Sequence, residues 1–486
     1  MFRYFAAALL SLAIVFSVRS SAQEVLYTPY EKFDFRTDDY AVVGLVNGKF
    51  IDYRNNSDGP ILEIYNDSMN KEATILLDFI PGKVYQIKFI TYTDQIIVLY
   101  QSLEGNKVTQ YAAMLDAEGR LKSKPIELGS AKTSIFGAMK TYFYTVVSED
   151  KKRIFVYTIS NKTHSFAIVG KWIDEQLEVM NRSEVEFKTD DVVYAADLNV
   201  DNSGTVYLAA FTTLGVQNYA DQYWLLSLKQ GDSKLMVHTM DFGDRFGTSG
   251  YLKIDNIRHK VYFGGFYSSK KNGKNEGVIY AIFDGATEQF ETIKFLPFSN
   301  ELLAQLSNVG DGHAFDNFNV LQVIVKNDGG FVVIAERQFV TTRTNYLPTV
   351  GYYSMFYSPM TSSSAVREYH YDEIIALAYD QAGNNLWNKV VPKRQYSQED
   401  EGLFSSYLML NSGSSLVFLF NDFNDSHSKI QMANLKPEGL IEYNYFTSDA
   451  ADYPDWIPRA GKQIAARELI VPCLHKKQLC FARVRF

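Results

Sequence analysis

Cysteine, histidine and long apolar runs are all scarce in this sequence, and each shortage excludes a class of protein. The 486 residues include 2 cysteines and 7 histidines. No two histidines form an H-x-H or H-x-x-x-H pair, so the short zinc-binding motifs are absent. Beyond the N-terminal segment, no apolar stretch approaches the roughly 20 residues of a membrane-spanning helix. The G-x-S-x-G, Walker and dinucleotide-binding motifs are also missing, so the sequence carries no catalytic signature and implies no cofactor.

The two cysteines lie close together near the end of the chain. Cys473 and Cys480 flank a short polar stretch that is typical of a hairpin tip, so they are expected to face each other across two strands. In an exported protein this arrangement favours one disulfide. Two free thiols are the alternative, because a bridge directly across two strands is geometrically demanding. Zinc normally needs four ligands, and only His475 is near.

Positive charge is in deficit as well. The chain has 48 Lys and Arg against 56 Asp and Glu, a net charge of −8. Loss of an N-terminal segment containing Arg3 and Arg19 would shift the net charge to −10. A net acidic surface gives no support for binding nucleic acid or an anionic membrane, so neither is an expected partner.

The N-terminal segment, residues 1–22, is predicted to be a signal peptide. A positively charged start is followed by the apolar run Tyr4–Val18, and Ser20 to Ala22 supply the small residues of a cleavage site. A membrane anchor is the alternative, but the apolar run is shorter than a spanning helix requires. No cysteine follows the cleavage site, so a lipid anchor is not expected. The predicted location is the periplasm, the outer surface or the extracellular space.

Aromatic residues are abundant, with 33 Tyr and 34 Phe, and this abundance favours β-strands. Short runs that are apolar on both faces recur along the chain, as is typical of strands buried in a stack of sheets. These runs begin at Ile96, Ile154, Val206, Val261, Phe331 and Leu416. Hairpins with polar turns follow most of them, in Tyr111–Leu121, Trp224–Leu235, Val278–Phe290, Ile374–Trp387 and Ile430–Ile441.

A period near 55 residues, made of about four short strands, predicts an all-β β-propeller in one domain over residues 40–486. Residues 23–39 are expected to be an extended lead-in. We count seven blades if the final hairpin, Glu468 to Phe486, is completed by the early strands within Ile61–Phe79. Eight blades are the alternative, because Ala41–Tyr53 is unused in that scheme. An outer-membrane barrel is a weaker rival, because the apolar runs do not alternate as barrel strands must.

One hairpin carries a resemblance to a known group of proteins. Asp380, Gly383 and Trp387 form the pattern D-x-x-G-x-x-x-W, with weaker copies at Asp116/Gly119 and Pro437/Gly439. In this pattern the chain resembles exported bacterial β-propeller proteins of unknown function. The resemblance implies a propeller fold and an exported protein.

The largest irregularity in the repeat is an insertion at about residues 338–373. Aromatic rings among small polar residues make good contact surfaces, and long loops in compact folds often carry function. The insertion and its charged base therefore predict a binding surface for a partner protein or a glycan. The candidate binding residues are Tyr346, Tyr352, Tyr353, Phe356, Tyr357, Tyr369, Tyr371, Glu336 and Arg337. Rings that merely pack against the neighbouring blade are the alternative.

The favoured function is thus a non-enzymatic binding or scaffold protein of the cell envelope. The alternative is a hydrolase for polysaccharide or phosphate esters, in which Glu336, Asp372 and Glu373 would supply the carboxylates. Two stretches carry possible metal ligands, Asn421–Asp425 and Asp311 to Asp316. The first lacks the glycine and the final acid of an EF-hand loop, and both are more typical of ordinary loops, so no metal site is predicted.

Overall fold

The fold consists almost entirely of antiparallel β-sheets. The computed structural model describes residues 24–34, 37–81, 84–132, 142–162, 164–190, 192–213, 220–271, 273–309, 315, 317–344, 365–423, 429–446 and 454–486. Strands that are adjacent in sequence pair with each other in sheets of four. Within the described ranges the sheets form eight such units, which we call blades 1 to 8. Blades 4 and 5 are joined into one sheet by a single pair, Ala220 and Gly247.

Blades 1 to 4 follow one another along the chain. Blade 1 comprises β3 (Asp39–Val46), β4 (Lys49–Asn56), β5 (Gly59–Tyr65) and β6 (Lys71–Leu76). Blade 2 comprises β7 (Val84–Thr91), β8 (Gln95–Glu104), β9 (Lys107–Asp116) and β10 (Ile126–Lys132). Blade 3 comprises β11 (Tyr144–Val147), β12 (Ile154–Lys162), β13 (Ser165–Ile173) and β14 (Val179–Phe187). Blade 4 comprises β15 (Val193–Val200), β16 (Val206–Thr213), β17 (Ala220–Leu228) and β18 (Met236–Met240).

Blades 5 to 7 continue the pattern. Blade 5 comprises β19 (Phe246–Asp255), β20 (Lys260–Ser268), β21 (Gly277–Asp284) and β22 (Gln289–Pro297), followed by helix α2 (Asn300–Val309). Blade 6 comprises β23 (Phe318–Val325), β24 (Phe331–Thr344), β25 (Ala365–Tyr379) and β26 (Asn385–Val391), with β27 (Gln395–Gln398) added to β25. Blade 7 comprises β28 (Leu408–Asn411), β29 (Leu416–Asp422), β30 (Lys429–Leu435) and β31 (Ile441–Phe446).

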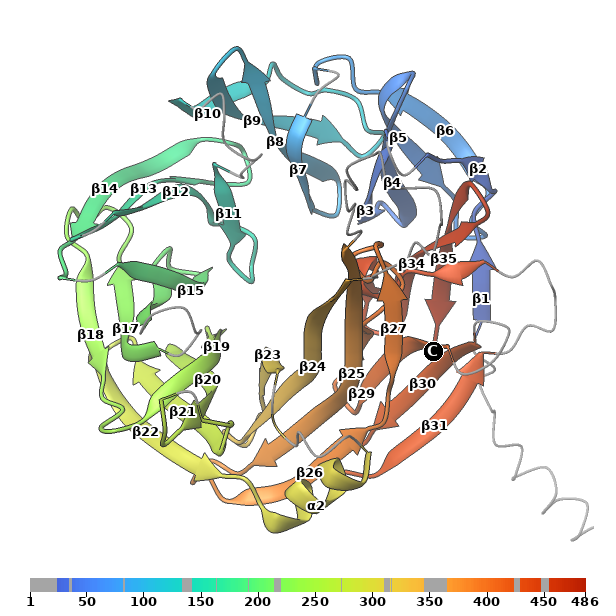
Figure 1. Ribbon diagram of the computed structural model, residues 1–486. Helices are drawn as coiled ribbons and strands as arrows, with labels where there is room; N and C mark the ends of the chain where they lie inside the picture. The colour runs from blue at the N-terminus through green and yellow to red at the C-terminus, as the bar shows by residue number, and fades with distance from the viewer. Residues whose placement is uncertain are drawn as a thin grey trace, which may run out of the picture.

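Blade 8 is built from both ends of the chain and closes the ring. The C-terminal part supplies β32 (Asp455–Trp456), the 3-10 turn η1 (Pro458–Ala460), β33 (Lys462–Ala465), β34 (Glu468–His475) and β35 (Gln478–Arg485). The N-terminal part supplies β1 (Glu24–Tyr27) and β2 (Glu31–Lys32), which both pair with β35. In Figure 1 the blades stand around a central channel, with the first strand of each of blades 1 to 6 inside, whereas in blade 8 the first strand of the chain, β1, lies at the rim.

The predicted β-propeller is confirmed, and closure by strands from both ends is found. The structure has eight blades, which was the alternative to the predicted seven. The terminal hairpin and the strands within Ile61–Phe79, which were predicted to share one blade, belong to different blades. Ile61–Tyr65 lies in β5 and pairs with β4, so the Asn47-Gly48 hairpin completes blade 1 by itself. The terminal hairpin instead takes its fourth strand from β1, in the segment expected to be only a lead-in.

The core consists of apolar layers between neighbouring blades. In β8, Ile96 and Val98 pack toward blade 1, while Ile97 and Leu99 pack toward blade 3. Alternate side chains of a strand point to opposite faces of its sheet, so a strand between two blades must be apolar on both faces. This geometry explains the short, non-alternating apolar runs of the sequence.

The D-x-x-G-x-x-x-W hairpin shows how the polar turns are made. Asp380 Oδ1 accepts a hydrogen bond from Asn384 N at 2.8 Å, and Gly383 has a φ of 85°. A carboxylate acceptor and a glycine at positive φ are the features that such a turn requires. Trp387 reaches the next blade, where its Nε1 donates to the carbonyl of Pro437 at 2.9 Å. The motif therefore combines a turn with a contact between blades.

Cys473 and Cys480 are opposite each other in the β34–β35 ladder, as the sequence predicted. Both are buried, and neither is bridged in the structure, so the disulfide stays a prediction. Burial raises the pKa of the Cys473 thiol, and the neighbouring Cys480 raises it further.

We expect iodoacetamide to alkylate the native protein very slowly at pH 8, because the thiolate is the reactive form and both sulfurs are shielded. Alkylation of the unfolded protein in urea without reductant, followed by mass spectrometry, then gives the redox state of the two cysteines. Two adducts per chain would indicate free thiols, and none would indicate the disulfide. Rapid labelling of the folded protein would contradict the burial.

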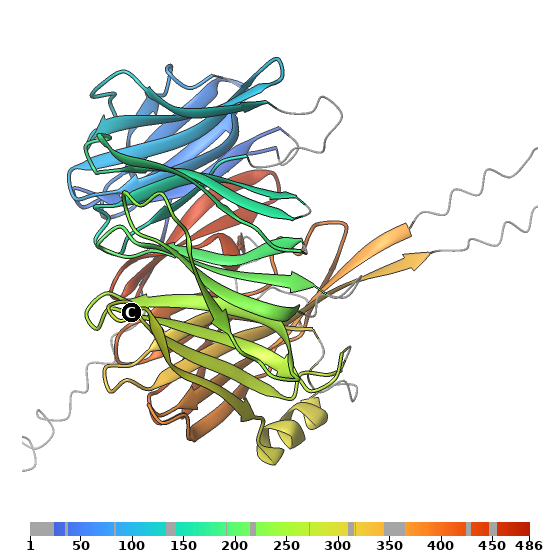
Figure 2. The same ribbon diagram turned by 90° about the vertical axis from the view of Figure 1, so that its left-hand side faces the viewer.

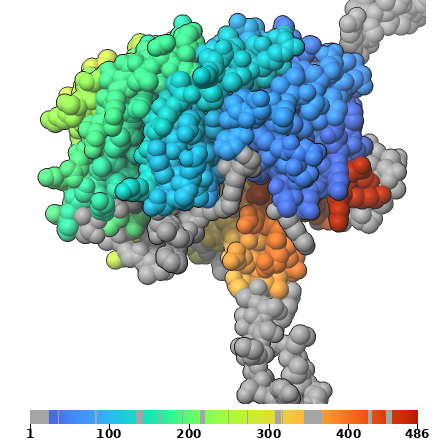
Figure 3. Space-filling model, turned by 90° about the horizontal axis from the view of Figure 1, so that it is seen from above, coloured from blue at the N-terminus to red at the C-terminus, as the bar shows by residue number. Residues whose placement is uncertain are grey.

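The insertion forms an arm at one face of the ring. β24 and β25 continue past the blade as a long hairpin, with Gln338–Thr344 paired to Ala365–Tyr371, and β27 adds a third strand. Figures 2 and 3 show this hairpin standing out from the body of the ring. Among the described residues, no helix is long and apolar enough to cross a membrane.

Candidate functional site

The predicted binding residues fall into two groups. Tyr346, Tyr352, Tyr353, Phe356 and Tyr357 lie outside the described residues. Tyr369 and Tyr371 lie on the arm, on the same face as Val340 and Gln338. The phenol of Tyr371 accepts a hydrogen bond from Arg459 at 3.4 Å, which ties the base of the arm to η1 of blade 8. A partner-binding role for these residues stays a prediction.

Glu336 lies in a buried ion pair beneath the arm. Its Oε1 is 2.7 Å from Lys393 Nζ, and both side chains are almost fully buried. Lys393 also donates to the carbonyl of Tyr371 at 2.8 Å and to Gln395 Oε1 at 2.9 Å. Ser406 donates to Glu336 Oε2 at 2.7 Å. Glu336 Oε1 has no hydrogen-bond partner besides this ion contact, so the carboxylate depends on Lys393 for the compensation of its charge.

Arg337, Asp372 and Glu373 form a second charged group beside this pair. Arg337 Nη1 lies 3.9 Å from Asp372 Oδ2 and 3.8 Å from Glu373 Oε2. The two carboxylates therefore lie within the ~10 Å limit of a two-carboxylate hydrolase. Burial raises the pKa of both carboxyl groups, and the charge of Arg337 opposes this shift.

The surroundings of these acids favour a structural role. Asp372 exposes 8% of its surface and Glu373 exposes 6%. Glu373 borders a pocket of about 160 Å³, whose wall also carries Lys393 and Arg394. The sequence analysis thus identified residues that do come together, but they lie at a small site that already contains its own counter-charges.

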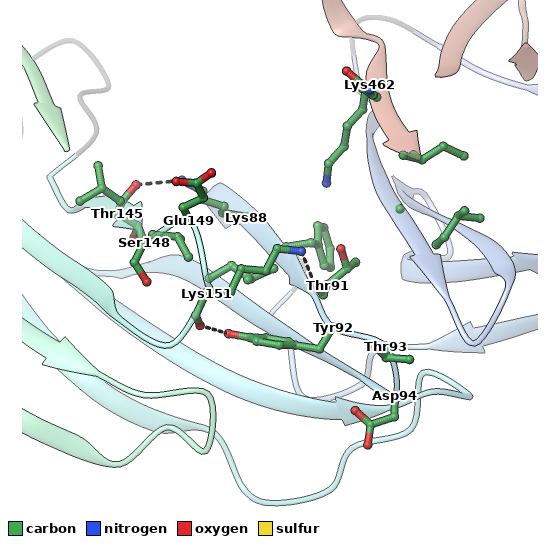
Figure 4. Close-up of a pocket in the computed structure, with 18 of the residues that line it drawn as sticks. Lys88, Thr91, Tyr92, Thr93, Asp94, Thr145, Ser148, Glu149, Lys151 and Lys462 are labelled. Atoms are coloured by element: carbon green, nitrogen blue, oxygen red, sulfur yellow. Dashed lines mark hydrogen bonds between the residues drawn. The ribbon is translucent and has the colours of Figure 1, made fainter. Parts of the chain in front are cut away.

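A much larger cavity, of about 920 Å³, opens at the central channel. Its walls come from the inner strands β3, β7, β11, β15 and β33, that is, from blades 1 to 4 and blade 8. Three lysines line it, Lys88, Lys151 and Lys462, and we call it the lysine cavity (Figure 4). No sequence motif marked these residues, which lie in three different blades.

Each ammonium group of the lysine cavity is held by a backbone carbonyl. Lys88 donates to the carbonyl of Thr145 at 2.8 Å, Lys151 to that of Thr91 at 2.7 Å and Lys462 to that of Val43 at 2.8 Å. These bonds aim the side chains along the channel wall and leave the charges unneutralised. Within the described part of the chain, none of the three lysines forms an ion pair with a carboxylate.

The cavity lowers the pKa of two of these lysines. Partial loss of water lowers the pKa of Lys88. The pKa of Lys462 is lowered first by the same desolvation and then by the positive charges of Lys151 and Lys88. The charges of Lys151 and Lys88 therefore act on Lys462 across the cavity. A bound anion would offset this repulsion.

Polar side chains complete the lining of the lysine cavity. Hydroxyl groups come from Thr91, Thr93, Thr145 and Ser148. The Tyr92 hydroxyl donates to the carbonyl of Lys151 at 2.8 Å, which fixes the turn after β11. Two acids, Asp94 and Glu149, also border the cavity. Glu149 Oε2 accepts a hydrogen bond from Asn256 at 2.7 Å, so part of its charge is engaged elsewhere.

The lysine cavity and the arm lie on opposite faces of the ring. The inner strand β7 ends at the cavity, in Thr91 and Tyr92. β24 is the second strand of its blade and runs antiparallel to the inner strand β23, so it ends at the other face, where the arm begins. Among the described residues, no group of three or more His, Cys, Asp or Glu side chains is placed to hold a metal ion.

The fold and this cavity define a β-propeller with three lysines and two acids at its channel mouth. No protein-family model and no curated protein sequence matches the chain. Among solved structures, it is similar to prolyl oligopeptidase B from Galerina marginata, with 12% identity and a TM-score of 0.41. That match covers 90% of this chain, which spans 56% of the length of the oligopeptidase.

Two polysaccharide lyases are similar at the same level. The lyase Uly1 has 10% identity and a TM-score of 0.41, over 82% of this chain and 89% of the lyase. A PL25 ulvan lyase has 9% identity and a TM-score of 0.38, over 81% of this chain and 90% of the lyase. The structural neighbours are thus hydrolases and lyases, but identities and scores this low carry no argument about activity.

Proposed function

We propose that this chain is an exported, non-enzymatic binding protein that holds an anionic ligand in the lysine cavity. The observation that carries the proposal is the convergence, on the wall of a cavity of about 920 Å³, of three ammonium groups that form no ion pair with any described carboxylate. Export is supported by the predicted signal peptide at residues 1–22. A binding role agrees with the absence of a catalytic motif from the sequence.

The charge balance of the molecule supports an anionic ligand. The chain as a whole carries a net charge of −8, so a cluster of three lysines at one place differs from the acidic character of the rest of the chain. Repulsion among them costs free energy in the empty cavity, and an anion turns that repulsion into attraction. The volume lies at the upper end of the ~300–1,000 Å³ range of small-ligand sites.

Titration calorimetry with citrate at low salt tests the proposal. Replacing Lys462 or Lys151 by Met keeps a long unbranched side chain and removes its charge. Each variant should bind citrate about 10-fold more weakly. Lys107→Met is the matched control, because Lys107 is an exposed lysine that lies 3.8 Å from Glu127 and outside the cavity. Its affinity should not change.

The pH dependence provides a second readout. Because the pKa values of Lys88 and Lys462 are lowered, citrate binding should weaken as the pH rises through those lowered values, before free lysine would lose its charge. Absence of citrate binding, or equal affinity in the cavity variants and the wild type, would overturn the proposal.

A further inference from the structure

A side pocket of about 140 Å³ lies beside the lysine cavity, between blades 2 and 3. Both spaces share Lys88 and Thr145. Gln86 lies two residues before Lys88 on β7, so the side pocket lies deeper in the channel than the lysines. A ligand bound at Lys88 therefore lies at the border of both spaces.

Buried amides make the side pocket rigid and polar. Gln101 is 1% exposed, and its Nε2 donates to Gln86 Oε1 at 2.6 Å and to the carbonyl of Phe143 at 2.8 Å. Gln110 is 2% exposed and donates to the carbonyl of Tyr111 at 3.0 Å. Amides fixed in this way form a prearranged wall, which lowers the cost of ordering a ligand.

Tyr144 gives the side pocket an open aromatic surface. Its ring is stacked on Tyr157, with centroids 5.6 Å apart and an interplanar angle of 27°. Tyr157 is buried, whereas Tyr144 stays 43% exposed. The stacking holds the Tyr144 ring in place and leaves apolar area uncovered toward the channel. A ring with a hydroxyl handle is suited to a ligand that has both apolar and polar edges.

We propose that the ligand of the lysine cavity is an acidic oligosaccharide, with one uronate ring packed on Tyr144 and its carboxylate on Lys88. This inference rests on the proposed anion binding and names its chemical class. A sugar ring offers a C–H face for the tyrosine, and the uronate carboxylate offers an acceptor for the ammonium group.

The lining residues favour a carboxylate over a phosphate. No arginine lines either space within the described residues. Arginine is the side chain best suited to bidentate recognition of phosphate, whereas lysine acts as a point charge. The aromatic ring and the neighbouring amides favour a glycan over an acidic peptide, which lacks rigid rings with hydroxyl edges.

Binding of trigalacturonate, citrate and neutral galactotriose separates this inference from the proposal on which it rests. Tyr144→Ala should weaken trigalacturonate binding at least 10-fold and leave citrate binding unchanged. Tyr194→Ala is the matched control, because Tyr194 is 41% exposed on the inner strand β15 and its ring packs at a tilt against Phe211 outside both spaces. It should bind trigalacturonate normally. Tyr144→Leu keeps an apolar side chain and serves as a second variant if the alanine variant folds poorly.

Each outcome bears on one of the two claims. If the wild type binds neither citrate nor trigalacturonate, the anion site itself is wrong. If citrate binds but Tyr144 variants bind trigalacturonate normally, or if galactotriose binds as tightly as trigalacturonate, the uronate inference is overturned. Tighter binding of tetraglutamate with the same dependence on Tyr144 would reassign the site to an acidic peptide.

Discussion

Replacing Lys393 by Met is expected to destabilise the folded propeller by about 3–5 kcal/mol, because it leaves a buried charge without its partner. Glu336 exposes 0% of its surface, and Lys393 Nζ lies 2.7 Å from its Oε1. Removal of the ammonium group leaves the carboxylate with neutral donors from Ser406 and Gln338. The same change removes the donor for the Tyr371 carbonyl at the base of the arm.

Urea unfolding followed by tryptophan fluorescence measures the effect. Glu336→Gln combined with Lys393→Met removes both charges, so the double variant should recover much of the loss. Lys326→Met is the control, because Lys326 pairs with exposed Asp328 at 3.0 Å, and exposed ion pairs contribute at most about 1 kcal/mol. Equal urea midpoints of unfolding for Lys393→Met and the control would show that the buried pair does not stabilise the folded propeller.

The architecture was predictable because each blade repeats one local pattern. The runs at Ile96 and Leu416 are apolar on both faces, and only a strand between two sheets needs that composition. The polar turns, such as Asp380 to Gly383, are set by neighbouring residues alone. Signals of this kind depend on short segments, so they survive without any knowledge of the tertiary structure.

The blade count failed where pairing depends on distant parts of the chain. Glu24–Tyr27 carries a weak apolar pattern, and its pairing with Arg485 to Ala482 spans almost the whole sequence. Ala41–Tyr53 was left unused in the seven-blade count, because the repeat spacing did not show whether β3 and β4 opened a new blade. Closure of a ring is a property of the complete fold, and local patterns cannot fix which strand completes it.

The lysine cavity was not predicted for a related reason. Lys88, Lys151 and Lys462 are far apart in sequence, and each is an ordinary charged residue near the end of a short strand. Their convergence follows from the ring, which brings the inner strands of several blades to one channel. A usable signal would have been lysine at the ends of inner strands, where side chains reach the channel mouth. By contrast, Glu336 and Arg337 could be predicted as candidates from the sequence, because they directly follow the apolar run that begins at Phe331.

Removal of β1 is expected to have the other large effect, because β1 is the outer strand of the blade that closes the ring. Glu24–Tyr27 pairs residue by residue with Ala482–Arg485. Val25 and Tyr27 pack on the core between blades 7 and 8, and Trp456 Nε1 donates to the Tyr27 hydroxyl at 3.3 Å. Loss of these ladder bonds and of this apolar contact should lower stability by roughly 3–5 kcal/mol, at about 1 kcal/mol for each hydrogen bond.

Comparison of a chain that begins at Glu24 with one that begins at Thr28 tests this expectation. Thr28 stays in both chains and keeps its own bonds to Phe481, at 3.0 Å and 2.9 Å. The shorter chain should unfold at lower urea concentration and associate as its concentration rises, because β35 then presents an unpaired edge. Arg485→Leu is the control, since it removes the partly exposed contacts to Glu24 and Asp67 but keeps β1 paired. If the shorter chain matched the longer one in stability and stayed monomeric, the ring would be held by β34 and β35 alone, and the N-terminal strand would not be part of its closure.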